Sequence, residues 1–129
     1  MPLFFYSLTL HLTFIGKFFL INRLRISRAT RDHTKEFRAI HGLVNAHSSV
    51  ALYPRVFELL EQRLTLAQKL QKQREEFNSF KSYAEVYEQL SKFDTARNFC
   101  RRAITVAKTI QDNRQELALL DRLTQISYQ

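Results

Sequence analysis

Hydrophobic residues recur at steps of three and four positions through most of this chain, which is the spacing that places side chains on one face of a helix. The clearest stripe lies in residues 74–91 and consists of Phe77, Phe80, Tyr83, Ala84, Tyr87 and Leu90. A short turn at Ser91 and Lys92 separates it from a second stripe in residues 94–111, which consists of Ala96, Phe99, Cys100, Ala103, Ile104, Ala107 and Ile110. Further helices are predicted over residues 37–48, from Pro54 to about Lys72, and from about Arg114 onward. The pattern predicts antiparallel helices joined by short turns.

Residues 43–82 and 83–122 are two copies of one pattern, forty positions apart. The aligned pairs include Tyr53 with Phe93, Leu60 with Cys100, Leu64 with Ile104, Ala67 with Ala107, Gln71 with Gln111 and Arg74 with Arg114. Large apolar residues meet large ones and small residues meet small ones, as expected when each copy stacks on the next. We therefore predict an all-α fold, an α-solenoid of about three stacked antiparallel helical hairpins. A third, degenerate copy would begin the chain.

Composition supports a helical fold and an intracellular location. Two glycines and two prolines in 129 residues are too few for the turns of a β-rich fold. A single cysteine excludes a disulfide framework, so we expect a reducing, cytoplasmic compartment. Cys100 occupies the position of Leu60 in the previous copy, and we expect it to be a small buried hydrophobic residue rather than a reactive thiol.

The chain divides into residues 1–30, which are apolar and then basic, and residues 31–129, which hold the repeats. Residues 3–22 contain five of the eleven phenylalanines and one charge, Lys17. Three interpretations stay open for this segment: a degenerate first hairpin, a membrane anchor, which needs about 20 apolar residues, or a segment without stable structure. An alternation from Leu8 to Phe14 has the period of a strand, but a single strand would have no pairing partner in a helical array.

The net charge of +8 is concentrated near the N-terminus. Residues 17–38 contain seven lysines and arginines against Asp32 and Glu36. Such a run attracts nucleic acid, anionic lipid or an acidic protein surface, although it most often forms a solvated helix face. Aromatic residues are not interleaved with these charges on a surface, which argues against specific RNA recognition.

One hairpin resembles the tetratricopeptide (TPR) family. The matching positions are Tyr83, Ala84, Tyr87, Ser91, Phe93, Ala96, Cys100 and Ala103. The forty-residue period is similar to a lengthened TPR variant whose hairpins are linked by an AKxIxDxRxE joint, here residues 107–116. Val56, Arg63 and His47 depart from the pattern, and their hairpin is expected to pack more loosely.

The resemblance implies a scaffold that binds a protein or peptide on a concave face formed by the first helix of each hairpin. The residues carried onto that face are Arg38, His41, Asn45, Asn78, Lys81, Ser82, Glu85 and Gln89. The carboxylate clamp of chaperone-binding TPR proteins is not recognisable. Alternatives are a membrane-anchored or peptide-sensing regulatory module and a basic helical protein that binds nucleic acid.

Catalytic and metal chemistry lack candidates in the sequence. Two glycines cannot form a glycine-rich phosphate loop, and the four histidines have no partner at metal-ligand spacing. We therefore expect no enzyme activity, no cofactor and no metal site. The last predicted helix carries Leu117, Leu120 and Leu123 without a following helix to cover them, which suggests self-association or continuation of the array.

Overall fold

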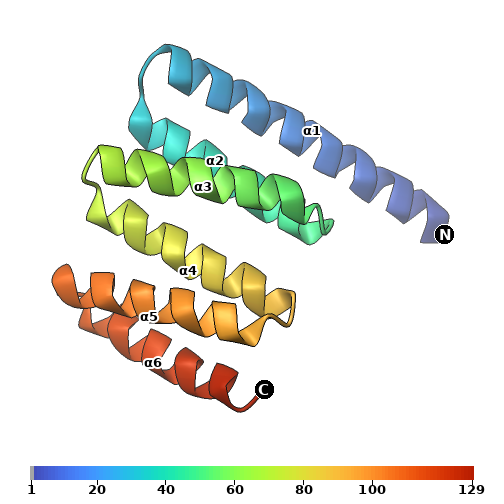
Figure 1. Ribbon diagram of the computed structural model, residues 1–129. Helices are drawn as coiled ribbons and strands as arrows, with labels where there is room; N and C mark the ends of the chain where they lie inside the picture. Colours follow the sequence, from blue (N-terminus) through green and yellow to red (C-terminus); the bar gives the residue numbers. More distant parts are fainter. Residues whose placement is uncertain (1) are drawn as a thin grey trace. The chain divides into compact units, whose positions relative to one another are not determined.

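The computed structural model describes the backbone of residues 2–129 and the side chains of residues 14–129. Over this range the chain is all-α, without strands, which confirms the predicted fold class. The helices are α1 (Pro2–Ala29), α2 (His33–Ser49), α3 (Tyr53–Lys69), α4 (Gln73–Gln89), α5 (Phe93–Thr109) and α6 (Asn113–Ser127) (Figure 1). Helices α2 to α6 begin and end close to the predicted positions, except that α2 begins earlier, at His33, and α3 ends at Lys69 rather than near Lys72.

Every connection between consecutive helices has the same three-residue geometry. The middle residue of each has a left-handed backbone, and these residues are Arg31 (φ 55°), Ala51 (59°), Gln71 (54°), Ser91 (58°) and Gln111 (58°). They follow one another at intervals of twenty residues, so the forty-residue sequence repeat consists of two helix-turn units.

The turn after α2 shows how each connection is closed. The Ala51 N–H donates to the Ser48 carbonyl at 3.1 Å, and the Leu52 N–H donates to the His47 carbonyl at 2.9 Å. This pair of bonds is the Schellman arrangement, which satisfies carbonyls at a helix C-terminus. Leu52 then accepts the first bond of α3, from the Val56 N–H at 3.2 Å. The same residue therefore ends one helix and begins the next.

The chain forms two compact units, residues 1–59 and residues 60–129. In the first unit α1 packs against α2. The two helices lie close together at Gly42, where a Cβ atom would lie 3.0 Å from both terminal methyl carbons of Leu20. Leu24 and Ser27 are also buried, and Arg28 of α1 forms an ion pair with Glu36 of α2 at 3.2 Å.

The N-terminal segment differs from a hairpin folded within residues 1–30. The backbone of residues 2–29 is one continuous helix, and it packs against α2. The side chains of residues 3–13, on which the membrane-anchor interpretation also depends, lie outside the described residues. In the part of the chain that is described, no helix is long and apolar enough to cross a membrane.

In the second unit α4 packs against α5, and α5 packs against α6 (Figure 1). The residues of α5 that face these neighbours are small: Ala96, Cys100, Ala103 and Ala107 are fully buried. Large rings cover them, with Tyr83 of α4 stacked on Phe99 of α5 at a centroid distance of 4.6 Å. Small residues of α5 and aromatic residues of both α4 and α5 therefore form this core, as the stripes predict.

Two of the three residues that depart from the TPR pattern are buried, and the third is half-buried. The side chain of Arg63 is 5% exposed, and its Nη2 atom lies 3.0 Å from Oε2 of Glu75 in α4. Val56 is fully buried as well. His47 is half-buried with an Nδ1 atom that has no hydrogen-bond partner, and burial, followed by Lys17 and Arg55, lowers its pKa.

Candidate functional site

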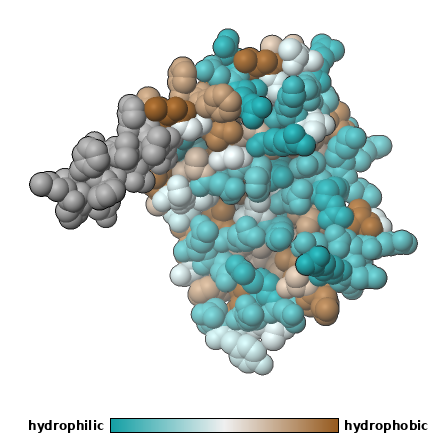
Figure 2. All heavy atoms as spheres, turned by 180° about the vertical axis from the view of Figure 1, so that it is seen from behind, coloured by the Kyte–Doolittle hydropathy of each residue, from teal (hydrophilic) through white to brown (hydrophobic). Residues whose placement is uncertain are grey.

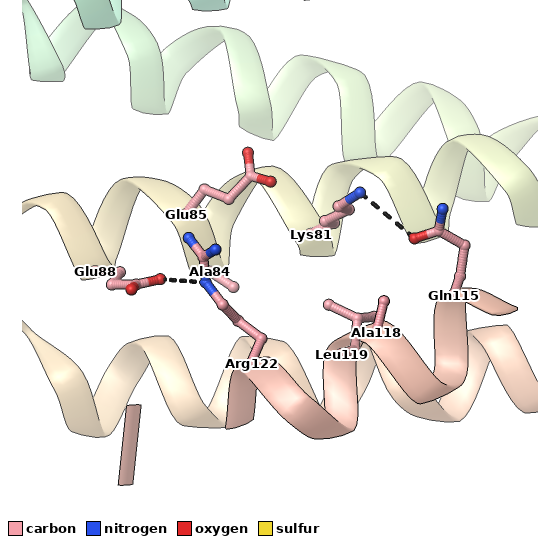
Figure 3. Close-up of a pocket in the computed structure, with 8 residues that line it drawn as sticks. All are labelled: Lys81, Ala84, Glu85, Glu88, Gln115, Ala118, Leu119 and Arg122. Atoms are coloured by element: carbon pink, nitrogen blue, oxygen red, sulfur yellow. Dashed lines mark hydrogen bonds and ion pairs between the residues drawn. The ribbon is translucent and has the colours of Figure 1, made fainter. Parts of the chain in front are cut away.

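A groove of about 250 Å³ lies between α4 and α6 in the second unit. Its lining residues are Lys81, Ala84, Glu85 and Glu88 from α4 and Gln115, Ala118, Leu119 and Arg122 from α6 (Figure 3). Each helix contributes residues at positions i, i+3, i+4 and i+7, which is the spacing of a single helical face. The groove is therefore formed by one stripe from each of two helices that are separated in sequence by α5.

The start of α6 is held in place by Asp112. One carboxylate oxygen accepts the Gln115 N–H at 3.1 Å and so caps the helix, and the other accepts from Nη1 of Arg74 in α4 at 2.8 Å. These bonds lower the pKa of the Asp112 carboxyl, with the Gln115 contact as the largest cause. The cap links the first turn of α6 to the first turn of α4 and fixes one end of the groove.

Two polar contacts cross the groove (Figure 3). Nζ of Lys81 lies 3.4 Å from Oε1 of Gln115, and Nε of Arg122 donates to Oε2 of Glu88 at 2.8 Å. Among the described residues, Glu85 takes part in no ion pair, and its carboxylate is exposed. The groove thus offers both donors and acceptors and carries two positive and two negative side chains.

The floor of the groove is apolar and lined by small side chains. Ala84 and Leu119 are buried, whereas Ala118 is exposed. Because Ala84 and Ala118 end at Cβ, an extended chain could approach the two helices closely. The arrangement suits binding of a short apolar or mixed segment.

The only cysteine lies beneath this floor. Cys100 is fully buried, and its thiol donates to the Leu119 carbonyl at 3.4 Å. Burial raises the pKa of the Cys100 thiol, which disfavours the reactive thiolate. Cys100 is therefore a buried hydrophobic residue, as its repeat position predicts. Within residues 14–129 no group of three metal-ligating side chains could hold a metal ion.

The structure brings together only part of the predicted binding face. Lys81 and Glu85 line the groove. Three other predicted residues of α4 lie outside it: Asn78 and Ser82 are half-buried, and Gln89 is exposed. The remaining three predicted residues, Arg38, His41 and Asn45, are exposed on α2 in the first unit, where His41 and Asn45 are hydrogen-bonded at 3.3 Å.

The half of the groove that comes from α6 is absent from the predicted set. The signal for it was present in the repeat, since Ala118 and Arg122 stand forty residues after Asn78 and Ser82. Gln115 and Leu119 stand forty residues after Glu75 and Ser79, which are not among the predicted binding residues. The repeat register alone therefore identifies only two of the four groove residues of α6. The side chains that face the groove depend on how α6 lies beside α4.

No protein-family model matches the chain, and a search of curated proteins found no match either. The fold and the groove are therefore the basis for any statement about function.

Proposed function

We propose that this chain is a non-catalytic, TPR-like scaffold that binds a peptide segment of a partner protein in the groove between α4 and α6. The observation that carries the proposal is the groove itself, formed by the first helices of successive hairpins and lined by Lys81 and Glu85. The resemblance to TPR repeats supports it, because those arrays bind peptides on the corresponding face.

The chemistry of the groove supports peptide binding. An extended segment carries an N–H and a carbonyl on nearly every residue. Lys81 and Gln115 supply donors for its carbonyls, and the exposed carboxylate of Glu85 supplies an acceptor for its N–H groups or for a basic side chain. The apolar floor of Ala84, Ala118 and Leu119 would bury one small or medium-sized apolar side chain of the peptide.

The groove is preformed on rigid elements. Its residues lie within helices rather than loops, and Arg122–Glu88 at 2.8 Å holds two lining side chains in position. Binding would therefore require little ordering of the scaffold, which leaves more of the interaction energy for affinity.

The proposal is tested by screening a library of short peptides for binding and comparing Ala118→Leu with Thr105→Leu. Ala118→Leu places a larger side chain on the groove floor, and we expect it to weaken binding at least about tenfold, which corresponds to 1.4 kcal/mol. Thr105 is exposed on α5 and does not line the groove, so Thr105→Leu adds an apolar side chain elsewhere and should leave affinity within about twofold.

Two results would contradict the proposal: a library without any binding peptide, or a bound peptide whose affinity is the same for both variants. Circular dichroism of each variant verifies that the helices are retained. Changes in backbone amide NMR shifts that concentrate on α4 and α6 would support the assigned groove.

A further inference from the structure

The outward face of α1 is apolar although it is open to solvent. Its exposed large side chains are Phe14 (68%), Ile15 (49%), Phe18 (61%), Phe19 (57%), Ile21 (48%) and Ile26 (54%). With roughly 200 Å² for each such residue when fully exposed, they expose on the order of 600 Å² of apolar surface in total. This area is at the upper end of what a typical monomer exposes, and such patches mark interaction sites. Figure 2 shows apolar atoms gathered on this part of the surface.

The exposed side chains are not the face that α1 uses for folding. Leu20 lies against Gly42 of α2, which leaves room for its side chain, and Leu24 is buried. Phe14, Phe18 and Ile21 follow one another at steps of four and three residues and form a stripe on another side, and Ile15, Phe19 and Ile26 form a neighbouring one. Together they cover a broad convex surface, wider than the narrow stripe that one packed helix buries.

The same face changes from apolar to basic along the helix axis. Arg25 continues the stripe of Phe14, Phe18 and Ile21 one turn further, and Arg23 lies beside the second stripe, with its guanidinium 5.2 Å from the ring centre of Phe19. Aromatic and basic side chains are therefore neighbours on this surface, contrary to the expectation from the sequence. Both arginines are exposed, and residues 2–29 contain no aspartate or glutamate. Nearby Glu36, which could offset this charge, is buried and bonded to Arg28 and His33.

We propose that this outward face of α1 binds the surface of an anionic lipid bilayer. The phenylalanines and isoleucines would enter the boundary between headgroups and acyl chains, while Arg23 and Arg25 contact lipid phosphates or carboxylates. A convex helix with aromatic residues and arginines is suited to this interface, where long basic side chains reach the headgroups and apolar ones are buried. The face lies along the membrane plane, with α2 on its other side.

The exposed apolar residues of α6 provide a contrast. Leu117 (64% exposed) and Leu120 (41%) lie on a helix whose charges balance, with Glu116 and Asp121 against Arg114 and Arg122, and Arg122 is bonded to Glu88. This apolar stripe therefore has no excess of basic side chains that would attract anionic lipid. The lipid assignment therefore applies to α1 and supplies a matched control on α6.

The experiment uses the full chain and vesicles of phosphatidylcholine with or without phosphatidylserine, separated by flotation. We expect the chain to float with anionic vesicles and to bind neutral vesicles at least about tenfold less. Phe14→Ser/Phe18→Ser should reduce binding about tenfold or more. Arg23→Glu/Arg25→Glu should reduce it more strongly, by at least about fivefold for each residue.

The control is the double variant Leu117→Ser/Leu120→Ser on α6, which should bind anionic vesicles like the unmodified chain.

Tryptophan fluorescence is a second measurement, and it does not require loss of apolar residues. Because the chain has no tryptophan, Phe18→Trp and Leu117→Trp each introduce a single fluorescent reporter. We expect a blue shift and quenching by brominated lipid for Phe18→Trp with anionic vesicles, and neither for Leu117→Trp.

Three outcomes would overturn the inference. The first is absence of binding to anionic vesicles together with an unshifted Phe18→Trp spectrum. The second is binding that requires the arginines but not the phenylalanines, which would indicate charge attraction without insertion. The third is concentration-dependent dimerisation without lipid that Phe14→Ser/Phe18→Ser abolishes, which would assign the face to a second copy of the chain.

Discussion

Replacement of Ala51 by glycine should stabilise the protein. Ala51 has φ 59° in the turn after α2, and its side chain is exposed, so its Cβ atom contributes no packing. A left-handed backbone costs a residue with a Cβ atom about 1–2 kcal/mol. Glycine removes that cost but adds freedom to the unfolded chain, which is worth about 0.5–1 kcal/mol. The net expectation is a gain of about 0.5–1 kcal/mol.

Urea denaturation measures this gain in the free energy of unfolding. Thermal unfolding is a second measurement, in which Ala51→Gly should raise the midpoint by about 2–4 °C. The matched control is Ala118→Gly, in which the same substitution is made at an exposed position inside α6. Glycine in a helix interior costs about 1 kcal/mol, so the two variants should change stability in opposite directions. Equal destabilisation by both would refute the left-handed assignment of Ala51.

The same substitution at other connections extends the test. Gln71, Ser91 and Gln111 have φ values of 54–58° at the equivalent position. These turns are well separated from one another in sequence, so gains from independent sites should add within about 0.3–0.5 kcal/mol. A gain limited to Ala51 would show that side chains at the other turns make contacts that offset their backbone cost.

Further predictions concern the core and two titrating groups. Arg63→Ala should cost about 2–3 kcal/mol in urea denaturation, because it removes a buried ion pair and leaves the partly exposed Glu75 without its partner, whereas Arg63→Met should cost much less. Ala103→Leu should destabilise by about 1–3 kcal/mol, since Ala103 is fully buried where α5 packs against its neighbours, and an unchanged midpoint would contradict that packing. Burial, followed by Glu61 and Tyr87, raises the pKa of Tyr83 to about 12, so ultraviolet titration should show one tyrosine ionising near that pH, and Tyr83→Phe should remove this step. Stability contributed by the neutral phenol should be lost as pH rises above the ordinary tyrosine value. Because folding lowers the pKa of the Asp112 carboxyl, the stability that this carboxylate contributes is present at neutral pH and is lost as pH falls through the lowered pKa. The difference in thermal stability between the unmodified protein and Asp112→Asn should therefore shrink in acid, and a constant difference would refute this linkage.

The repeat period and the core were largely determined by local sequence. The stripes in residues 74–91 and 94–111 predict which faces are buried, and Phe77, Ala84, Cys100 and Ala103 are indeed buried. The turn at Ser91 and the break between residues 111 and 114 were predicted without glycine as a signal, because the apolar period is interrupted there. Left-handed backbone at those residues was not predicted, since no side chain that favours it marks the position.

The N-terminal segment was predicted less well. Apart from the strand-like alternation from Leu8 to Phe14, its apolar residues follow no clear period, so the pattern cannot indicate which face is buried or where a turn lies. The structure resolves this for the described part through one contact, in which Gly42 of α2 accommodates Leu20 and leaves Phe14 and Phe18 outside. Packing against α2 therefore selects the inner face of α1.

The sequence by itself determined the helices, their period and the small residues at close helix crossings, because these depend on neighbours within a few residues along one helix. Only the tertiary structure decided that Lys81 and Glu85 share a groove with Ala118 and Arg122, and that Arg63 is buried against Glu75. The groove joins α4 to α6 across the width of α5, so its lining depends on how three helices pack. Periodicity shows which side of each helix faces inward, but the distance and angle between two helices come from the volumes of all the side chains packed between them.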